Sequence, residues 1–367
     1  MLDTLTLHIG HPKTGTTSLQ ATFRDNAALL ARHGLYYFGG HRNNHPIARQ
    51  LHRSSQHARD ARVTERFEKG LAETDCAQAF MSSETLIRLS LDEANDAVAK
   101  YRRFAHQVRV LAYVRHPVST ASSLAHQAIR TGRALADVEA SPRVLPLKRI
   151  LSRWGGAVGR DNLIVRPFDR RLLVGGDIVD DVLDTLGVGA AAPDMARVRQ
   201  NDPLSVVAAH LLNSAQRIEP ERDLAIPSMR VFDAIGGPRY VLPLQSQERV
   251  RQEAAEDMAF LRDEFSIVLP EPSDAPSPPP ELTPEVMETL GRALYRLSQY
   301  AYAVDRSPMA RLFGVRSPYS TAWDASPHPL APLMERLGVT RRLIGRELRA
   351  DRPALKPDDV EPSDPGA

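Results

Sequence analysis

Two segments of this 367-residue sequence carry residue types that bind phosphate groups. The first, residues 10–18, reads GHPKTGTTS. Lys13 supplies a positive charge, and Thr16, Thr17 and Ser18 supply hydroxyl donors. In a glycine-containing turn that opens a helix, backbone N–H groups and the positive end of the helix dipole point at one spot. The segment therefore predicts an anion-binding turn.

The position of the lysine decides which kind of turn this is. A Walker A loop has the pattern GxxxxGK[ST], and Gly10 and Gly15 have its spacing. Thr16 stands where that loop has its lysine, and the lysine of this segment is Lys13. The alternative is an ordinary strand–turn–helix junction with Thr and Ser side chains as caps. A lysine, two spaced glycines and several hydroxyls together favour an anion site that is not a Walker A loop.

The second segment, residues 115–123, reads RHPVSTASS. Arg115 ends a predicted strand, and Ser123 follows two turns into the predicted helix. A forked guanidinium and a directional hydroxyl in this arrangement can converge on one phosphate. Ser119 and Ser122 are weaker candidates. On its own an Arg-x-Pro strand end is more often an ordinary capped helix start, but its place after the Lys13 turn favours a second phosphate contact.

A carboxylate lies between the two segments, in Ser82-Ser83-Glu84 at the end of another predicted strand. Glu84 there can act as a general base, or it can simply complement the positive end of a helix N-terminus. The histidines of residues 41–57 are irregularly spaced and lack cysteine or carboxylate partners, so the sequence predicts no metal site there.

Hydrophobic periodicity places these segments in an α/β fold. Short apolar strands alternate with amphipathic helices over about 170 residues, which is typical of a mostly parallel sheet covered by helices on both faces. The predicted strands are residues 4–9, 35–38, 77–82, 108–114 and 162–168. The predicted helices are one from the turn to about residue 33, then 62–73, 117–130, 147–154 (with a loop at 155–159), 177–187, 205–217 and 245–265. Ligands of such sheets bind at the carboxyl ends of strands, where Lys13, Glu84 and Arg115 fall.

The two segments together resemble the motifs of bacterial-type sulfotransferases that use 3′-phosphoadenosine 5′-phosphosulfate (PAPS). PKTGTTSL is similar to their 5′-phosphosulfate loop, and residues 115–123 are similar to their 3′-phosphate motif. The resemblance implies a P-loop-like three-layer α/β fold. It does not extend past the proline-rich linker, beyond which amphipathic periodicity predicts a helical C-terminal extension. The resemblance also implies that PAPS is the donor and that no metal is required. The donor-binding residues implied are Lys13, Thr14, Gly15, Thr16, Thr17, Ser18, Arg115 and Ser123.

In that family, a sulfuryl group passes in line from PAPS to an acceptor hydroxyl. Transfer needs a base for the acceptor proton and a cation at the leaving phosphate. The resemblance gives the second role to Lys13 and the first to Glu84, with His45 and His41 as rivals. The acceptor is expected to be a small molecule or a glycan, with a carbohydrate or glycolipid hydroxyl as a guess from the family. Two alternatives stay open: a nucleotide-dependent kinase with a divergent P-loop, and a PAPS-binding protein without transfer activity.

Composition limits the other functions. The formal net charge is only +2, so no overall field draws the chain to nucleic acid or to anionic membranes. A single cysteine, Cys76, excludes an intrachain disulfide. We see neither a signal peptide nor an apolar run long enough to span a bilayer, so a cytoplasmic protein is expected. A basic stretch at 341–349 leaves peripheral membrane contact open.

The expected domain organisation has four parts. Residues 1–268 form the α/β core, and 269–282 form a proline-rich linker. Residues 283–350 form a helical extension, and 351–367 a disordered tail rich in proline and aspartate. The sequence does not indicate an oligomeric state.

Overall fold

The computed structural model describes residues 1–41, 43–54, 58–198, 204–218 and 236–272. The expectations for residues 273–367, including most of the linker, the helical extension, the tail and the basic stretch at 341–349, lie outside the described residues. The chain divides into two compact units. The first comprises residues 1–129, 133–203 and 240–277, and the described part of the second comprises 130–132, 204–218 and 236–239. The second holds helix α10 (Val206–Ile218).

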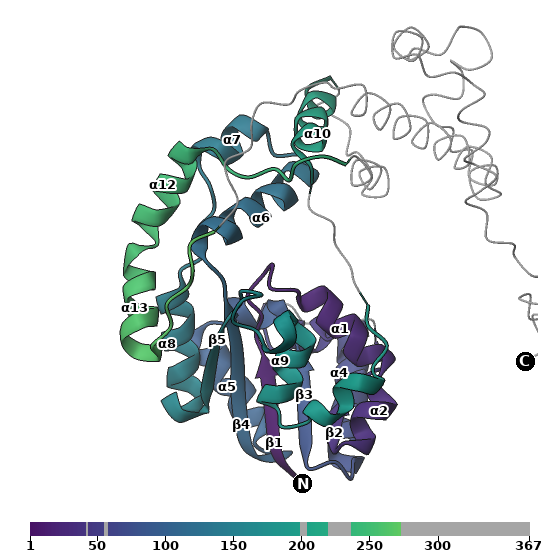
Figure 1. Cartoon of the computed structure of the whole chain (residues 1–367). Coiled ribbons are helices and arrows are strands. Elements are labelled where there is room, and N and C mark those ends of the chain that lie inside the picture. The colour runs from purple at the N-terminus through teal and green to yellow at the C-terminus, as the bar shows by residue number, and fades with distance from the viewer. Residues whose placement is uncertain (42, 55–57, 199–203, 219–235, 273–367) are drawn as a thin grey trace, which may run out of the picture. The chain divides into compact units, whose positions relative to one another are not determined.

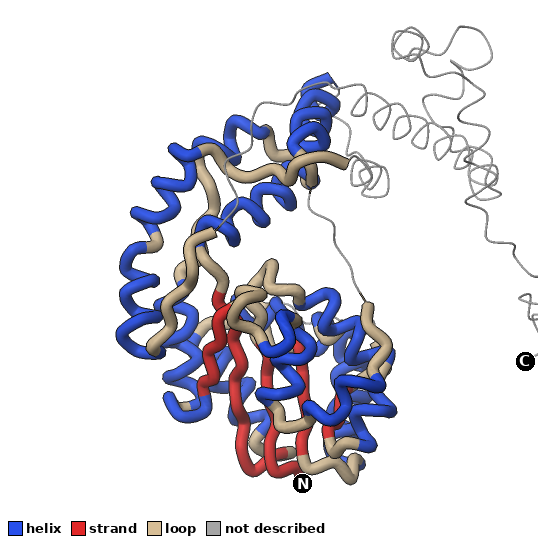
Figure 2. The backbone as a smooth tube through the Cα atoms, viewed as in Figure 1, coloured by secondary structure: helices blue, strands red, loops and turns tan. Residues whose placement is uncertain are grey.

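The first unit is built on a five-stranded sheet in which every strand pair is parallel (Figure 2). Its strand order is β2-β3-β1-β4-β5. The strands are β1 (Leu2–His8), β2 (Leu35–Tyr37), β3 (Gln78–Ser82), β4 (Ala105–Val114) and β5 (Leu163–Pro167). The predicted α/β class and parallel sheet are confirmed.

Helices cover both faces of the sheet (Figure 1). The helices of this unit are α1 (Thr16–Asp25), α2 (Ala27–Arg32), α3 (His45–Arg49), α4 (Ala58–Glu73), α5 (Leu91–Tyr101), α6 (Pro117–Arg130), α7 (Leu135–Ala140), α8 (Leu147–Val158), α9 (Ile178–Thr185), α12 (Leu244–Glu253) and α13 (Ala255–Phe265). Short 3₁₀ helices are η1 (Glu84–Arg88), η2 (Arg160–Asn162), η3 (Val174–Gly176) and η4 (Gly189–Asp194). Of these helices, α3, α5 and α7 were missed by the sequence reading.

Alternating side chains of the strands build two separate cores, because successive residues of a strand point to opposite faces. One core holds Val110 and Ala112 of β4 and packs against α4, α5 and α8. The other holds Leu111 and Tyr113 of the same strand and packs against α1, α2 and α9. This sandwich of helices, sheet and helices is the three-layer arrangement that the sequence predicts.

The single helix expected between the turn and residue 33 is wrong in one respect, because Asn26 divides it into α1 and α2. Asn26 has φ −115° and ψ 18°, which is not helical. Its side chain donates to the Thr22 carbonyl (2.7 Å) and to the Ala196 carbonyl (2.9 Å), and its Oδ1 accepts from the Ala196 N–H (3.1 Å). These bonds fix a segment 170 residues away, so the interruption serves a tertiary contact that local pattern does not reveal.

Two further boundaries differ from the prediction. Helix α8 continues through the expected loop at 155–159 to Val158. A Cβ at Gly155 would lie 3.4 Å from Leu163, so the glycine allows the helix to approach β5 closely. The helix expected over 245–265 is broken at Ala254 into α12 and α13. In the first turn of α13, Asp257 accepts from the N–H groups of Leu147 (2.9 Å) and Lys148 (2.8 Å), and thus caps α8.

The strand order places a topological switch point at the carboxyl end of β1. The helix that follows β1 covers one face of the sheet, whereas α5 after β3 and α8 after β4 cover the other. The connections of neighbouring strands therefore lie on opposite faces of the sheet. Ligands of such sheets bind at the point where the connections change face. Among the described residues, no helix is both long and apolar enough to cross a membrane.

Candidate functional site

The turn between β1 and α1 has an unusual backbone. Gly10 (φ 83°), Lys13 (φ 71°) and Gly15 (φ 72°) all have positive φ. Lys13 is one of only two non-glycine residues with positive φ in the described parts of the chain. A side-chain-bearing residue in this region costs about 1–2 kcal/mol, and such strain tends to occur at functional sites. The predicted anion-binding turn is thus a tightly wound loop whose lysine occupies a strained position.

The loop opens directly into a helix. Gly15 is the N-cap of α1 and has no side chain with which to cap it. The first turn of α1 contains no acidic residue. A helix end of this kind leaves N–H groups and a partial positive charge for an external anion.

The loop hydroxyls have different surroundings. The Thr14 hydroxyl is buried and donates to the His11 carbonyl (2.7 Å), so it holds the loop itself. The Thr16 hydroxyl is also buried and donates to the Glu84 carboxylate. Thr17 is exposed and Ser18 is half-buried. The hydroxyls of Thr17 and Ser18 are therefore better placed to meet a ligand than that of Thr14.

Glu84 lies beside the loop, as its place at the end of β3 predicts. In the sheet His8 pairs with Ser82, so the segments that follow β1 and β3 leave the sheet side by side. A Cβ on Gly10 would lie 3.2 Å from the Glu84 Cγ, which shows how closely the two segments pack. Burial raises the pKa of Glu84, while the Thr16 hydrogen bond, Lys13 and Arg88 oppose that shift. A carboxylate with a raised pKa is a better proton acceptor than an ordinary one.

The structure brings His45 to the same segment. Its Nδ1 is 2.8 Å from the Ser83 hydroxyl and 3.4 Å from the Thr85 hydroxyl. Burial lowers the pKa of His45, and nearby Arg49, Arg88 and His41 lower it further, so the imidazole is neutral at neutral pH. His41 makes only a local contact, from Nδ1 to the Asn43 carbonyl (2.9 Å). Of the two rival histidines, His45 is the one that contacts the Glu84 segment.

Arg115 joins the site from the other side of β1. Its Nη1 donates to the Lys13 carbonyl (3.1 Å), so the guanidinium contacts the loop directly. Its Cζ also lies 5.8 Å from the centre of the Phe168 ring. Phe168 follows β5 and would be 3.7 Å from a Cβ on Gly15. The loops after β1, β4 and β5 thus meet at one place. Phe168 was missed by the sequence reading, which contains no signal that would have found it.

The serines of α6 differ in how deeply their side chains are buried. Ser122 is buried, and its hydroxyl accepts from the Leu242 N–H (3.4 Å). Ser119 and Ser123 are half-buried and share one helix face, because they are four residues apart. Among the described residues, no contact joins Ser123 to Arg115. Its role as a partner of Arg115 stays a prediction.

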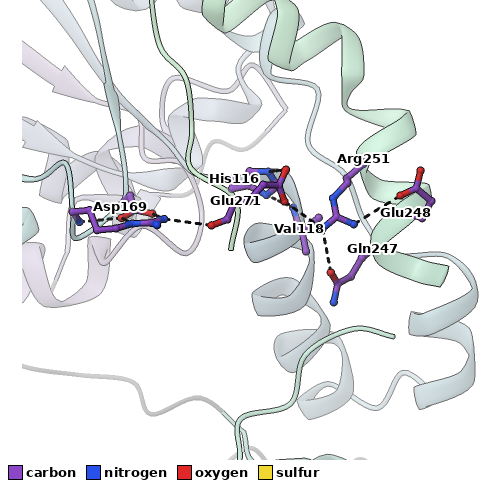
Figure 3. Close-up of polar contacts among 8 residues, drawn as sticks. His116, Val118, Asp169, Gln247, Glu248, Arg251 and Glu271 are labelled. Atoms are coloured by element: carbon purple, nitrogen blue, oxygen red, sulfur yellow. Dashed lines mark hydrogen bonds and ion pairs between the residues drawn. The ribbon is translucent and has the colours of Figure 1, made fainter. Parts of the chain in front are cut away.

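The residue after Arg115 is held by a network that the sequence reading missed (Figure 3). Glu271, which follows α13, places its carboxylate 3.3 Å from His116 Nε2 and 3.3 Å from Arg251 of α12. The Glu271 carbonyl accepts from Arg171 (3.4 Å), which is paired with Asp169 (2.7 Å). Segments far apart in the sequence therefore converge behind the Arg115 loop and support its position.

The four histidines of residues 41–57 do not form a metal site as far as the structure describes them. His41 and His45 have the contacts given above, and His52 lies 3.7 Å from Glu93. Among the described residues, no group of three His, Cys, Asp or Glu side chains is arranged to hold a metal ion.

Comparisons with known proteins do not assign the chain to a family. No family model matches the chain, and no curated protein is significantly similar to it. The fold and the arrangement of these residues are what supports a function.

Proposed function

We propose that this protein is a sulfotransferase that moves a sulfuryl group from PAPS to an acceptor hydroxyl. The main support for this proposal is that the loops after three adjacent strands bring Glu84, Lys13 and Arg115 together. Thr16 links the loop to Glu84, and Arg115 donates to the Lys13 carbonyl. The resemblance of both phosphate-binding segments to those of PAPS-dependent sulfotransferases supports the same function.

The residues fit a donor that carries two separate phosphate groups. The strained Lys13 loop at the open end of α1 offers a cation, backbone N–H groups and the hydroxyls of Thr17 and Ser18 to one of them. Arg115, on the far side of β1 from Glu84, would hold the other, with Ser123 as its expected partner. Arginine suits that role because its fork binds phosphate in a bidentate manner.

The chemistry assigns one task to each central residue. The donor supplies an activated sulfur whose bond to a bridging phosphate oxygen breaks as the acceptor oxygen bonds to it. Glu84 accepts the acceptor's hydroxyl proton, a role that its raised pKa favours. Lys13 stabilises the negative charge that the departing phosphate oxygen gains. His45, neutral and bonded to Ser83, is the alternative proton acceptor.

Calorimetric titration with 3′-phosphoadenosine 5′-phosphate (PAP), without magnesium, tests the donor. We expect the wild-type chain to bind it, and Arg115→Ala to weaken binding by about thirtyfold or more, because a charged hydrogen bond contributes about 2–3 kcal/mol. Arg109→Ala is the matched control. Arg109 belongs to the same strand, and six residues at about 3.3 Å each separate it from Arg115.

Two results would overturn the proposal. One is binding of ATP with magnesium but not of PAP, which would favour a nucleotide-dependent kinase. The other is a Lys13→Ala variant with wild-type PAPS affinity and turnover. A third result would support donor binding without transfer. In that case PAP binds, but the wild type shows no turnover, so Glu84→Gln and His45→Gln have none to lose.

A further inference from the structure

Arginines gather around η1, the short helix that Glu84 begins. In the sheet order, β3 and β4 lie on opposite sides of β1, so η1 after β3 and Arg115 after β4 flank the Lys13 loop from two sides. Arg88 lies at the end of η1, and Arg149 and Arg153 lie on α8, which packs against α5, β4 and β5. We call these three residues the Arg88 cluster.

The members of the cluster lie close to one another and to Glu84. Arg153 Nη2 donates to the carbonyl of Ile87 (2.9 Å), the residue before Arg88, so α8 contacts η1. Burial lowers the pKa of Arg153, and the neighbouring charge of Arg149 lowers it further, while Glu93 opposes the shift. Arg88 in turn acts electrostatically on Glu84, which begins the same five-residue helix. Arg88 thus lies beside Glu84, and α8 adds Arg153 and its neighbour Arg149 to the same short helix.

Other cations of this region have carboxylate partners. Arg49 makes a bidentate pair with Asp60 (2.7 and 2.9 Å). Arg53 is paired with Asp96 (2.7 Å). In contrast, the exposed Arg88 and Arg149 make no hydrogen bond or ion pair with any described residue. Arg88 faces the charge of Glu84 and Arg153 faces that of Glu93, so the three arginines outnumber these two carboxylates.

Like charges that outnumber their counter-charges repel one another, and a bound anion relieves that repulsion. The formal net charge of the whole chain is only +2, so this local excess is not a general feature of its surface. Arginine is also the side chain best suited to bind carboxylate, phosphate and sulfate groups. The Arg88 cluster therefore has the composition of an anion-binding surface.

We infer that the Arg88 cluster binds an anionic group of the acceptor, such as a carboxylate, a phosphate or a sulfate ester, while its hydroxyl meets Glu84. This inference rests on the proposed function and names the substrate class of the same site. The donor's phosphates are assigned there to the Lys13 loop and to Arg115, which leaves the cluster for the acceptor. An acceptor held by Arg88 has its hydroxyl within reach of a base on the same short helix.

The test uses sodium sulfate as the probe and the full chain saturated with PAP. The NMR signals of the arginine Nε–H groups are followed, with assignments made from the variants. We expect those of Arg88 and Arg149 to shift and saturate at millimolar sulfate, and not at chloride of equal ionic strength. Arg88→Gln should weaken the sulfate binding seen at Arg149 by about tenfold, since one charge-assisted contact is lost. Lys69→Gln, which removes an exposed cation of α4, should leave it unchanged.

Several outcomes would overturn the inference. Shifts that grow linearly without saturating, or an Arg88→Gln variant whose sulfate affinity stays within twofold of wild type, would show that the cluster is an ordinary solvated surface. Loss of sulfate binding on addition of PAP would assign the cluster to the donor. If PAP itself does not bind, the proposed function fails, and the titration of nucleotide-free Lys13→Ala protein still reports on the cluster.

Discussion

Gly10→Ala tests how tightly the loop and Glu84 are packed. Gly10 has φ 83°, and an added Cβ would lie 3.2 Å from the Glu84 Cγ and 3.5 Å from its Cα. The backbone conformation costs about 1–2 kcal/mol for a residue with a side chain. Crowding against a partly buried neighbour adds about 1–2 kcal/mol, the lower part of the range for overpacking. We therefore expect urea unfolding to show a loss of about 2–4 kcal/mol, and calorimetry to show weaker PAP binding.

Gly34→Ala is the control for this experiment. Gly34 has nearly the same φ (80°), but an added Cβ would meet nothing within 4 Å, so this variant isolates the backbone cost of about 1–2 kcal/mol. The excess in Gly10→Ala then measures the crowding at Glu84. Adding Glu84→Ala, which removes the contacting Cγ, should recover part of that excess. Equal losses in the two glycine variants, or additive losses in the double variant, would refute the close packing of loop and carboxylate.

Two further substitutions test the charges around the site. Asp181→Asn should destabilise the protein by about 3 kcal/mol in urea unfolding. The fully buried carboxylate forms a bidentate pair with Arg166 (2.5 and 2.6 Å) and accepts a hydrogen bond from the Tyr113 hydroxyl (2.6 Å). A loss below about 0.5 kcal/mol, which is typical of surface changes, would contradict this expectation. Glu84→Gln should raise the melting temperature at pH 8. Burial raises the pKa of Glu84, so its ionised form is less favourable in the folded chain than in the unfolded one. The variant should lose this advantage below the ordinary glutamate pKa of 4.5, where the carboxyl group is protonated in both states. A pH-independent difference, or a less stable variant at pH 8, would show that the Glu84 charge is well solvated or well paired.

Local pattern was sufficient for the sheet and for most of its helices. Strands with apolar residues on both faces, such as residues 108–114, are recognisable because a parallel sheet buries both faces. What the pattern could not show are features set by distant residues. The interruption at Asn26 depends on hydrogen bonds to Ala196. In α8, which continues through two glycines, Gly155 lies against Leu163 of β5 and Gly156 against Leu91 of α5.

The same distinction holds for the site. The sequence reading placed Lys13, Glu84 and Arg115 at one edge of the sheet, because each follows a strand and the strands were taken to be parallel. It had no means of finding Phe168 or Glu271, whose residue types carry no motif. Glu271 reaches His116 only because the chain after α13 returns to the carboxyl end of the sheet, and no spacing in the sequence encodes that return.

Which residue takes the acceptor's proton is the question on which the geometry bears most directly. Glu84 is joined through Thr16 to the loop, so under the proposed function its carboxylate would be held beside the bound donor. His45 is joined through Ser83 to the segment before Glu84 and is one step further from that loop. Burial raises the pKa of Glu84 and so strengthens it as a base, whereas burial lowers the pKa of His45 and weakens it. Under the proposed function, position therefore favours Glu84 as the base, with His45 as a group that orients its segment.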